Sequence, residues 1–75
     1  MIETIMISTS TKIKIELLKK GVTGAEIARQ LGVHRVAVYL VISGKSKSHR
    51  IRRAICQHTG LPWSIWAELD REKAA

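Results

Sequence analysis

Apolar residues recur at helical spacing in the first third of the chain. Ile13 and Leu17 stand four residues apart, which places both side chains on one face of an α-helix. Hydroxyl residues from Thr9 to Thr11 can cap the start of this helix, and Gly21 follows its last lysines. Residues 12–17 also alternate between polar and apolar, as a strand does. The strong helix formers that follow favour a helix.

A second helix is predicted by a capping pattern. Thr23 is followed three residues later by Glu26, and at this spacing the hydroxyl and the carboxylate each bind a free backbone N–H. The apolar stripe behind this start consists of Ile27, Ala28 and Leu31. Gly32 can end the helix, because glycine adopts the left-handed conformation at the lowest cost. A helix this short requires packing partners.

A third helix is predicted over residues 34–43. Its apolar positions at helical spacing are Val38, Val41 and Ile42. Ser43 and Gly44 are stop signals. Valines also suit a strand, but the helix before this segment favours a helical partner.

Two more helical segments are predicted near the end of the chain. Ser48 can cap a fourth helix that Gly60 ends. Its inner positions are Ile51, Ala54 and Ile55, and its outer positions are Arg50, Arg52 and Arg53. Pro62, acceptable at a first helical position, opens a fifth helix or helical turn. That segment carries Trp63, Ile65, Trp66 and Leu69.

The pattern therefore predicts an all-α protein, a compact bundle of four to five helices. Residues 11–75 would form a single domain, and residues 1–10 are left as an unassigned or flexible N-terminal segment. Cys56 is the only cysteine, so no disulfide can form within the chain. We expect Cys56 to be a buried and inert thiol.

Positive charge is concentrated in the middle of the chain. The formal net charge is +7 with a pI near 10.2, and residues 21–60 hold seven lysines and arginines against Glu26 alone. This distribution favours an anionic partner on one face. No apolar run approaches the roughly 20 residues of a membrane span, and no export signal is evident at the start. We expect a cytoplasmic protein with no membrane association.

Residues 24–43 have the residue pattern of a helix-turn-helix. Ala28 is small where the two helices would cross, and Gly32 permits a tight turn between them. Two helices joined by a turn of three to four residues that contains glycine allow the second helix to enter the major groove of DNA.

These residues resemble a known family. The run 22–33 (VTGAEIARQLGV) resembles the helix-turn-helix of the lambda-repressor-like superfamily, and residues 42–44 (ISG) resemble its usual ending. Residues 52–55 (RRAI), 60–62 (GLP) and 65–66 (IW) resemble the phage Ner-type branch. The resemblance covers about residues 12–67. It implies a four- to five-helix domain that binds operator DNA as a repressor or other regulator, without a cofactor.

Two positions depart from the family pattern. His34 stands where such families often have Ser or Thr as a helix cap, which predicts a loss of about 0.5–2 kcal/mol in helix stability. Ala67 stands where Ner-type tails often continue with proline. The course of the chain after Trp66 is therefore left open.

The outer positions of the third helix are the predicted base-reading residues. They are His34, Arg35, Val36, Tyr39, Leu40 and Ser43. Arg35 is the first candidate, because a guanidinium binds guanine O6 and N7 bidentately. Val36 and Leu40 would contact thymine methyl groups, or alternatively extend the core. Tyr39 can reach a base edge or a phosphate.

A second set is predicted to bind DNA phosphates. Its members are Thr23, Gln30, Lys45, Lys47, Ser48, His49 and Arg50. Hydroxyls and backbone donors at a helix start suit phosphate oxygens, and the helix dipole favours an anion there. The alternative is a solvated loop. Arg52 and Arg53 diverge by roughly 100° around a helix, so at most one of them would face DNA.

Other chemistry is not predicted. The three histidines and the single cysteine do not have the spacing of zinc ligands, and no catalytic motif is present. We therefore expect no metal, no cofactor and no enzymatic activity. Trp66 is expected in the core, and Trp63 as a lid on the core or a dimer contact.

The predicted function is that of a sequence-specific regulator of transcription, a phage-type repressor that reads an operator with residues 34–43. Its expected partners are double-stranded DNA in the bacterial nucleoid and a second copy of the chain, with a dimer formed either in solution or only on DNA, on half-sites roughly 34 Å apart. Two alternatives stay open. One is a protein-interaction module such as an antitoxin-like partner, and the other is a non-specific architectural DNA binder.

Overall fold

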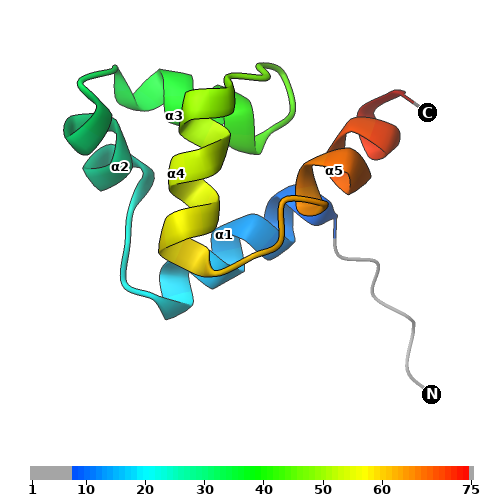
Figure 1. Cartoon of the computed structure of the whole chain (residues 1–75), viewed down its shortest axis with the longest axis horizontal. Coiled ribbons are helices and arrows are strands. Elements are labelled where there is room, and N and C mark those ends of the chain that lie inside the picture. Colours follow the sequence, from blue (N-terminus) through cyan, green and yellow to red (C-terminus); the bar gives the residue numbers. More distant parts are fainter. Residues whose placement is uncertain (1–7, 75) are drawn as a thin grey trace.

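A computed structural model describes residues 8–74, and these residues form five α-helices (Figure 1). The helices are α1 (Thr9–Lys19), α2 (Gly24–Leu31), α3 (Arg35–Ile42), α4 (His49–Thr59) and α5 (Ile65–Ala74). No strand occurs in residues 8–74, so the all-α prediction is confirmed and the strand alternatives are wrong. Most of the predicted N-terminal segment 1–10 lies outside the described residues, but Thr9 and Ser10 belong to α1.

The ends of α1 and α4 are set by side-chain caps and by glycine. Ser8, rather than Thr9–Thr11, caps α1, since its Oγ accepts a hydrogen bond from Thr11 N at 3.2 Å. Ser48 caps α4 as predicted, with 3.4 Å between its Oγ and Ile51 N. Gly60 ends α4 with a φ of 76°, a conformation that suits glycine best.

The predicted capping box of α2 is confirmed. Thr23 Oγ1 accepts a hydrogen bond from Glu26 N at 3.1 Å, and the Glu26 carboxylate accepts one from Thr23 N at 3.2 Å. Gly32 ends the helix in the left-handed conformation, with a φ of 70°. The chain then needs only Val33 and His34 to reach the start of α3.

The first turn of α3 corrects one prediction. His34 does cap the helix, because its Nδ1 accepts a hydrogen bond from Val36 N at 3.1 Å. A neutral imidazole nitrogen can therefore do here what a Ser or Thr oxygen does in other helices. The predicted loss of stability at this position assumed that no side chain would take that bond.

The fifth helix starts later than predicted. Pro62 and Trp63 lie in the turn before it, and Pro62 O accepts a hydrogen bond from Ile65 N at 3.0 Å. From Ile65 the helix continues through Ala74. The chain therefore continues as helix beyond Trp66, where the sequence left its course open.

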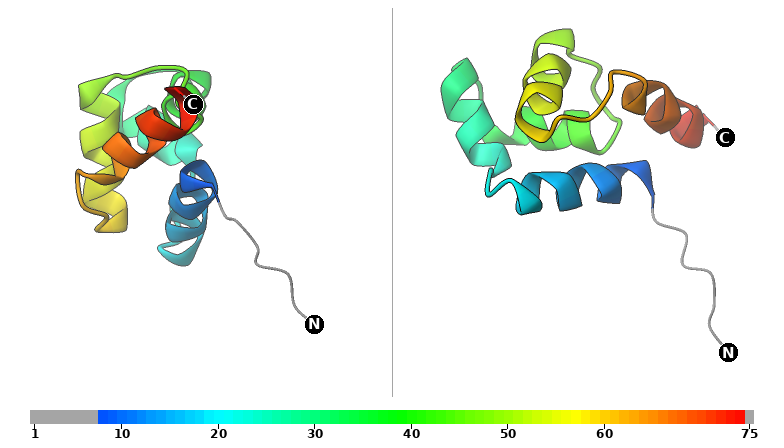
Figure 2. Two further views of the ribbon diagram at one scale, coloured as in Figure 1. Left: turned by 90° about the vertical axis from the view of Figure 1, so that its right-hand side faces the viewer. Right: turned by 60° about the horizontal axis from the view of Figure 1, so that its bottom comes forward.

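A continuous core joins the helices. It contains Ile13 and Leu17 of α1, Ile27 and Ala28 of α2, Val38, Val41 and Ile42 of α3, Ile51, Ala54 and Ile55 of α4, and Ile65, Trp66 and Leu69 of α5. Helix α1 runs along one side of the domain from α2 to α5 (Figure 2) and packs against α3, α4 and α5. Helix α2 packs against α3 and α4. The prediction that Trp66 belongs to the core is confirmed.

Arg52 is buried, which corrects its predicted place on the outside of α4. Its guanidinium lies 2.8 Å from Asp70 of α5 and 5.0 Å from the centre of the Trp66 ring. Its Nε has no partner among residues 8–74. A buried guanidinium requires a counter-charge, and Asp70 supplies it. Arg52 is therefore a structural residue that joins α4 to α5.

Helix α5 also contacts the start of α1. The Glu72 carboxylate accepts hydrogen bonds from the backbone N–H of Thr9 at 3.0 Å and from the Thr9 hydroxyl. Glu68 lies 3.9 Å from the ammonium of Lys12. An acid at a helix N-terminus is favoured by the helix dipole. The acids of α5 thus fix the last helix onto the first.

Cys56 is only half-buried, whereas the sequence predicted full burial. Its sulfur accepts a hydrogen bond from Trp66 Nε1 at 3.2 Å. The thiol thus satisfies the polar group of a tryptophan whose ring is otherwise in the core. No helix within residues 8–74 is both long enough and apolar enough to cross a membrane.

Candidate nucleic-acid interface

Helix α3 has two distinct faces. Val38, Val41 and Ile42 point into the core, and each is at most 1% exposed. On the other face, Val36, Tyr39 and Leu40 are 49%, 46% and 39% exposed. The alternative that Val36 and Leu40 extend the core is therefore wrong. A single short helix both anchors itself to the domain and presents a second surface to solvent.

Both ends of this outer face carry polar groups. His34 and Arg35 are exposed at the start of α3, and Arg35 has no carboxylate of residues 8–74 within ion-pair distance. Ser43 follows the last turn of the helix and is half-buried, and its hydroxyl donates a hydrogen bond to Leu40 O at 3.0 Å. Arg35 is thus available to a partner, while the Ser43 donor is occupied within the chain.

Tyr39 packs directly against the start of α2. A Cβ atom placed on Gly24 would lie 2.8 Å from Tyr39 Cε1, closer than two carbon atoms approach. Gly24 has no positive φ, so the backbone conformation does not require glycine here. A Cβ atom at this position would require the exposed Tyr39 ring to shift. Gly24 was not singled out from the sequence. The available signal was a glycine inside the first turn of a predicted helix, where no loop requires one.

A shallow hollow of about 200 Å³ opens beside Tyr39. Its lining consists of Lys14, Leu17, Leu18, Val22, Thr23, Gly24, Tyr39 and Ile42. This lining is mostly apolar, and its polar side chains are Lys14, Thr23 and Tyr39. The hollow shapes the surface between α1 and α3.

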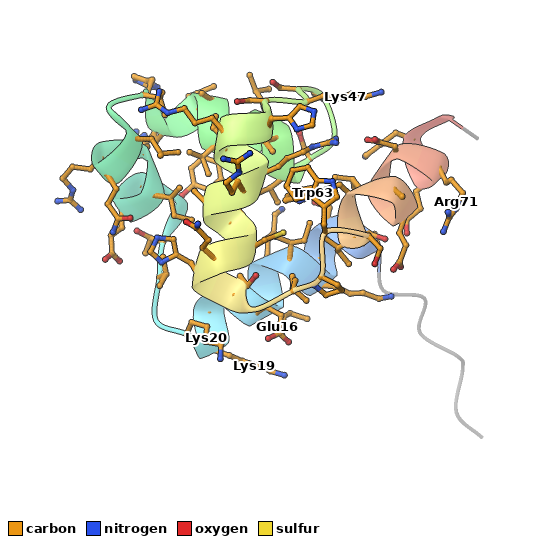
Figure 3. All side chains as sticks on the ribbon, in the orientation of Figure 1. Glu16, Lys19, Lys20, Lys47, Trp63 and Arg71 are labelled. Carbon is orange, nitrogen blue, oxygen red and sulfur yellow. The ribbon has the colours of Figure 1, made fainter. Side chains whose placement is uncertain are left out.

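Three of the seven predicted phosphate ligands are exposed side chains at the edges of the α2–α3 pair. Thr23 is the N-cap of α2, and the first backbone N–H groups of a helix have no partner within it. Lys45 and Lys47 lie in the loop between α3 and α4. Figure 3 shows Lys47 extending away from the body of the domain.

Like Thr23, whose hydroxyl belongs to the capping box, the other four predicted phosphate ligands make contacts within the chain. Gln30 Oε1 lies 2.8 Å from His58 Nε2, and Arg50 donates a hydrogen bond to Leu31 O at 2.7 Å. The His49 ring stacks on Trp63 with 5.5 Å between ring centres. The fourth, Ser48, caps α4. The partners of Gln30, Arg50 and His49 come from distant parts of the chain, so spacing along the sequence could not reveal them.

The charges of the domain divide into two groups. Each acid in the described part of the chain already has a partner: Glu16, Glu68 and Asp70 form ion pairs, Glu26 belongs to the capping box, and Glu72 binds Thr9. Several exposed cations, by contrast, have no carboxylate of residues 8–74 within 4 Å. Arg35, Lys45 and Lys47 lie on or just beyond α3, and others on the remaining helices and their ends include Lys14, Lys20, Arg29, Arg53, Arg71 and Lys73.

Two acids have pKa values below their ordinary range. The hydrogen bond from Arg52 lowers the pKa of Asp70, with a smaller contribution from the positive charge of Lys47. Hydrogen bonds from the Thr9 hydroxyl and backbone lower the pKa of Glu72. Both groups belong to the α5 attachment and not to the surface around α3.

Among residues 8–74, no three His, Cys, Asp or Glu side chains come together in a way that could hold a metal ion. Comparisons of the chain with protein families, with curated proteins and with solved structures gave no match. The interpretation of the surface around α3 therefore depends on its own geometry and charge. That surface combines an outward-facing helix, an exposed arginine at its start and unpaired lysines beyond its end.

Proposed function

We propose that this chain is a sequence-specific DNA-binding regulator of transcription, in which α2 and α3 form a helix-turn-helix and α3 enters the major groove. The resemblance of residues 22–33 to the lambda-repressor-like superfamily supports this assignment. So does the short connection through Gly32, Val33 and His34, since a glycine-containing turn of this length is typical of the motif. The same resemblance favours a repressor of phage or prophage type.

One observation carries the proposal. The outer face of α3 is exposed along its whole length and is bordered by cations that no carboxylate of residues 8–74 neutralises. Double-stranded DNA is a polyanion whose major groove accepts an α-helix. Both properties of the surface thus match one partner.

The proposed contacts fall into two classes. Arg35 would read guanine at the start of α3, because its guanidinium matches O6 and N7 of that base. Thr23, Lys45 and Lys47 would bind phosphates, which fixes position without reading sequence. Gln30, His49 and Arg50 would keep their contacts within the chain and hold α2 and α4 in place around α3.

Selection from a pool of random 30-base-pair duplexes tests the proposal. We expect enrichment of one sequence, bound at about 150 mM salt with at least 10³-fold preference over a scrambled duplex. Arg35→Ala should reduce that preference by about 10- to 100-fold, the value of one bidentate base contact. Arg71→Ala is the matched control. It removes an exposed arginine from α5, which lies at the far end of the domain from α2 (Figures 1 and 3).

Three outcomes are informative. Enrichment of one sequence, with a loss of preference only in Arg35→Ala, supports specific reading by α3. Equal binding to every duplex contradicts specific reading and favours an architectural DNA binder. No binding to DNA contradicts the proposal as a whole.

A second candidate function is favoured by one side chain. Trp63 is exposed outside the core and lies between α4 and α5 in Figure 3, with its ring stacked on His49. Exposed aromatic side chains are enriched at protein interfaces. A contact with another protein, or with a second copy on DNA, would use it. Sedimentation of the wild type and Trp63→Ala, with and without the selected duplex, tests this role, since a contact through Trp63 predicts a smaller complex for the variant.

A further inference from the structure

The outer face of α3 carries two exposed apolar side chains, Val36 and Leu40, next to the exposed ring of Tyr39. Val36 and Leu40 are exposed and stand four residues apart, so their side chains are neighbours on the helix surface. The Ser43 hydroxyl, which lies one turn further on, is already bonded to Leu40 O. Tyr39 packs against Gly24 and is 46% exposed. A base that faces Val36 and Leu40 would meet their methyl groups.

The apolar surface has polar surroundings that restrict what can cover it. His34 and Arg35 precede it, and Lys45 and Lys47 follow it. No carboxylate of residues 8–74 lies within 4 Å of the Arg35, Lys45 or Lys47 side chains. A partner that covers this surface must therefore offer anionic groups to the flanking cations and an apolar group to Val36 and Leu40. The DNA major groove has this combination, because phosphates border it and the C5-methyl group of thymine is its apolar feature.

We propose that α3 reads the C5-methyl groups of pyrimidines through Val36 and Leu40. This inference rests on the proposed DNA-binding function and specifies what the centre of the recognition helix recognises. The chain would distinguish thymine from uracil, which differs only by that methyl group. It would also bind more tightly when a cytosine at a contacted position carries a C5-methyl group.

Scanning replacement of thymine by deoxyuridine in the selected duplex tests the inference on the wild-type protein. Each thymine is replaced singly, and the dissociation constant is measured by fluorescence anisotropy at about 150 mM salt. Removing a contacted methyl should weaken binding about fourfold, the effect expected from one buried methyl-sized group. Thymines outside the contacted positions should show no change. Because the protein is unaltered, this measurement does not depend on how any variant folds.

Variants assign each methyl to a side chain. Val36→Ala and Leu40→Ala should each abolish the preference for thymine over uracil at one position and leave it intact at the others. Ile15→Ala is the control, because Ile15 is an exposed apolar side chain on α1 and not on α3. It should leave every preference unchanged. Circular dichroism of each variant checks that the helices are retained.

The outcomes separate this inference from the proposed function. Enrichment of one sequence, with deoxyuridine tolerated at every thymine, overturns methyl reading and leaves the DNA-binding function standing. If no sequence is enriched, both methyl reading and the sequence-specific DNA-binding function are contradicted. If Val36→Ala and Leu40→Ala alter the oligomeric state and leave the thymine preference unchanged, the surface serves a second copy of the chain and the inference is overturned.

Discussion

Two regions of this domain use charge in opposite ways. Where α5 meets α1 and α4, the acids of the last helix face partners that hold them: Asp70 binds Arg52, and Glu72 binds Thr9. Around α3, no carboxylate of residues 8–74 lies within 4 Å of Arg35, Lys45 or Lys47, although the charge of Lys47 helps to lower the pKa of Asp70. Paired charges can fix one helix onto another, whereas unpaired cations keep their attraction for an outside anion. The first region therefore stabilises the fold, and the second is available for binding.

Apolar side chains divide in the same way. Trp66 of α5 is 2% exposed and Trp63, three residues earlier, is 46% exposed. Helix α3 contains both kinds within eight residues, since Val38 is buried and Leu40 is not. We therefore expect stability and the proposed binding to depend on different residues, which substitutions can separate.

The largest expected effect is that of Trp66→Ala. Removing a buried tryptophan costs about 3–5 kcal/mol, and small domains have only about 5–15 kcal/mol of stability in total. The substitution also removes the ring under the Arg52 guanidinium. We expect the variant to be largely unfolded at 37 °C, as measured by urea denaturation followed by circular dichroism.

Trp63→Ala is the matched control for this prediction. It removes an exposed ring and its stacking on His49, so we expect a loss within about 1 kcal/mol. Similar losses for both tryptophans would show that α5 and the turn before it contribute equally to the fold. The proposed division between side chains that stabilise the fold and side chains that are free to contact a partner would then be wrong for Trp63 and Trp66.

A smaller loss of stability is expected from Asp70→Asn. The substitution leaves the buried Arg52 guanidinium without a counter-charge, which costs about 3–5 kcal/mol at a fully buried pair. The Asp70 side chain is one third exposed, so solvent screening reduces this to about 2 kcal/mol. Arg52→Met should cost less, because an apolar chain of similar length leaves no unpaired charge in the core. Thermal unfolding at pH 7 measures both variants.

Two acids of α5, Asp70 and Glu72, affect how stability responds to acid. Asp70 and Glu72 have pKa values below their ordinary range in the folded chain. Their contribution is therefore complete above the unfolded-state pKa of about 4 and is lost as the pH falls through the lower folded-state pKa. Unfolding temperatures measured between pH 7 and pH 2 should fall below pH 4, and less steeply in Asp70→Asn. An equal slope in both proteins would contradict the role of this ion pair.

Local features of the fold could be predicted from the sequence because they depend on neighbouring residues. Thr23 and Glu26 are three residues apart, and Gly32 needs only its own backbone conformation. The pairing of Arg52 with Asp70 spans 18 residues, and no local rule selects one acid among several. The His34 cap was missed because the expectation considered only oxygen acceptors.

The candidate site was predictable to a similar degree. Helical spacing separated Val38 and Val41 from the exposed side chains of α3, and the structure has both groups on the expected faces. The contacts of Gln30 with His58 and of Arg50 with Leu31 O were not predictable. They arise where α2 and α4 meet in space, and charge or polarity along the chain does not reveal such a meeting.

We expect the smallest effect on stability from substitutions in two pairs of lysines. The same substitutions test most directly whether the cations around α3 differ from cations elsewhere in the domain. Lys45→Ala with Lys47→Ala removes two cations beside α3, and Lys19→Ala with Lys20→Ala removes two at the opposite end of the domain (Figure 3). Each double variant should lose less than about 0.5 kcal/mol of stability per exposed residue. Only the first pair should change the slope of log affinity against log salt, by about 0.9 for each lost phosphate contact. Equal changes of this slope in both double variants would mean that DNA affinity depends on the total charge of the chain. A defined binding surface around α3 would then be contradicted, since such a surface predicts that only lysines beside α3 affect the slope.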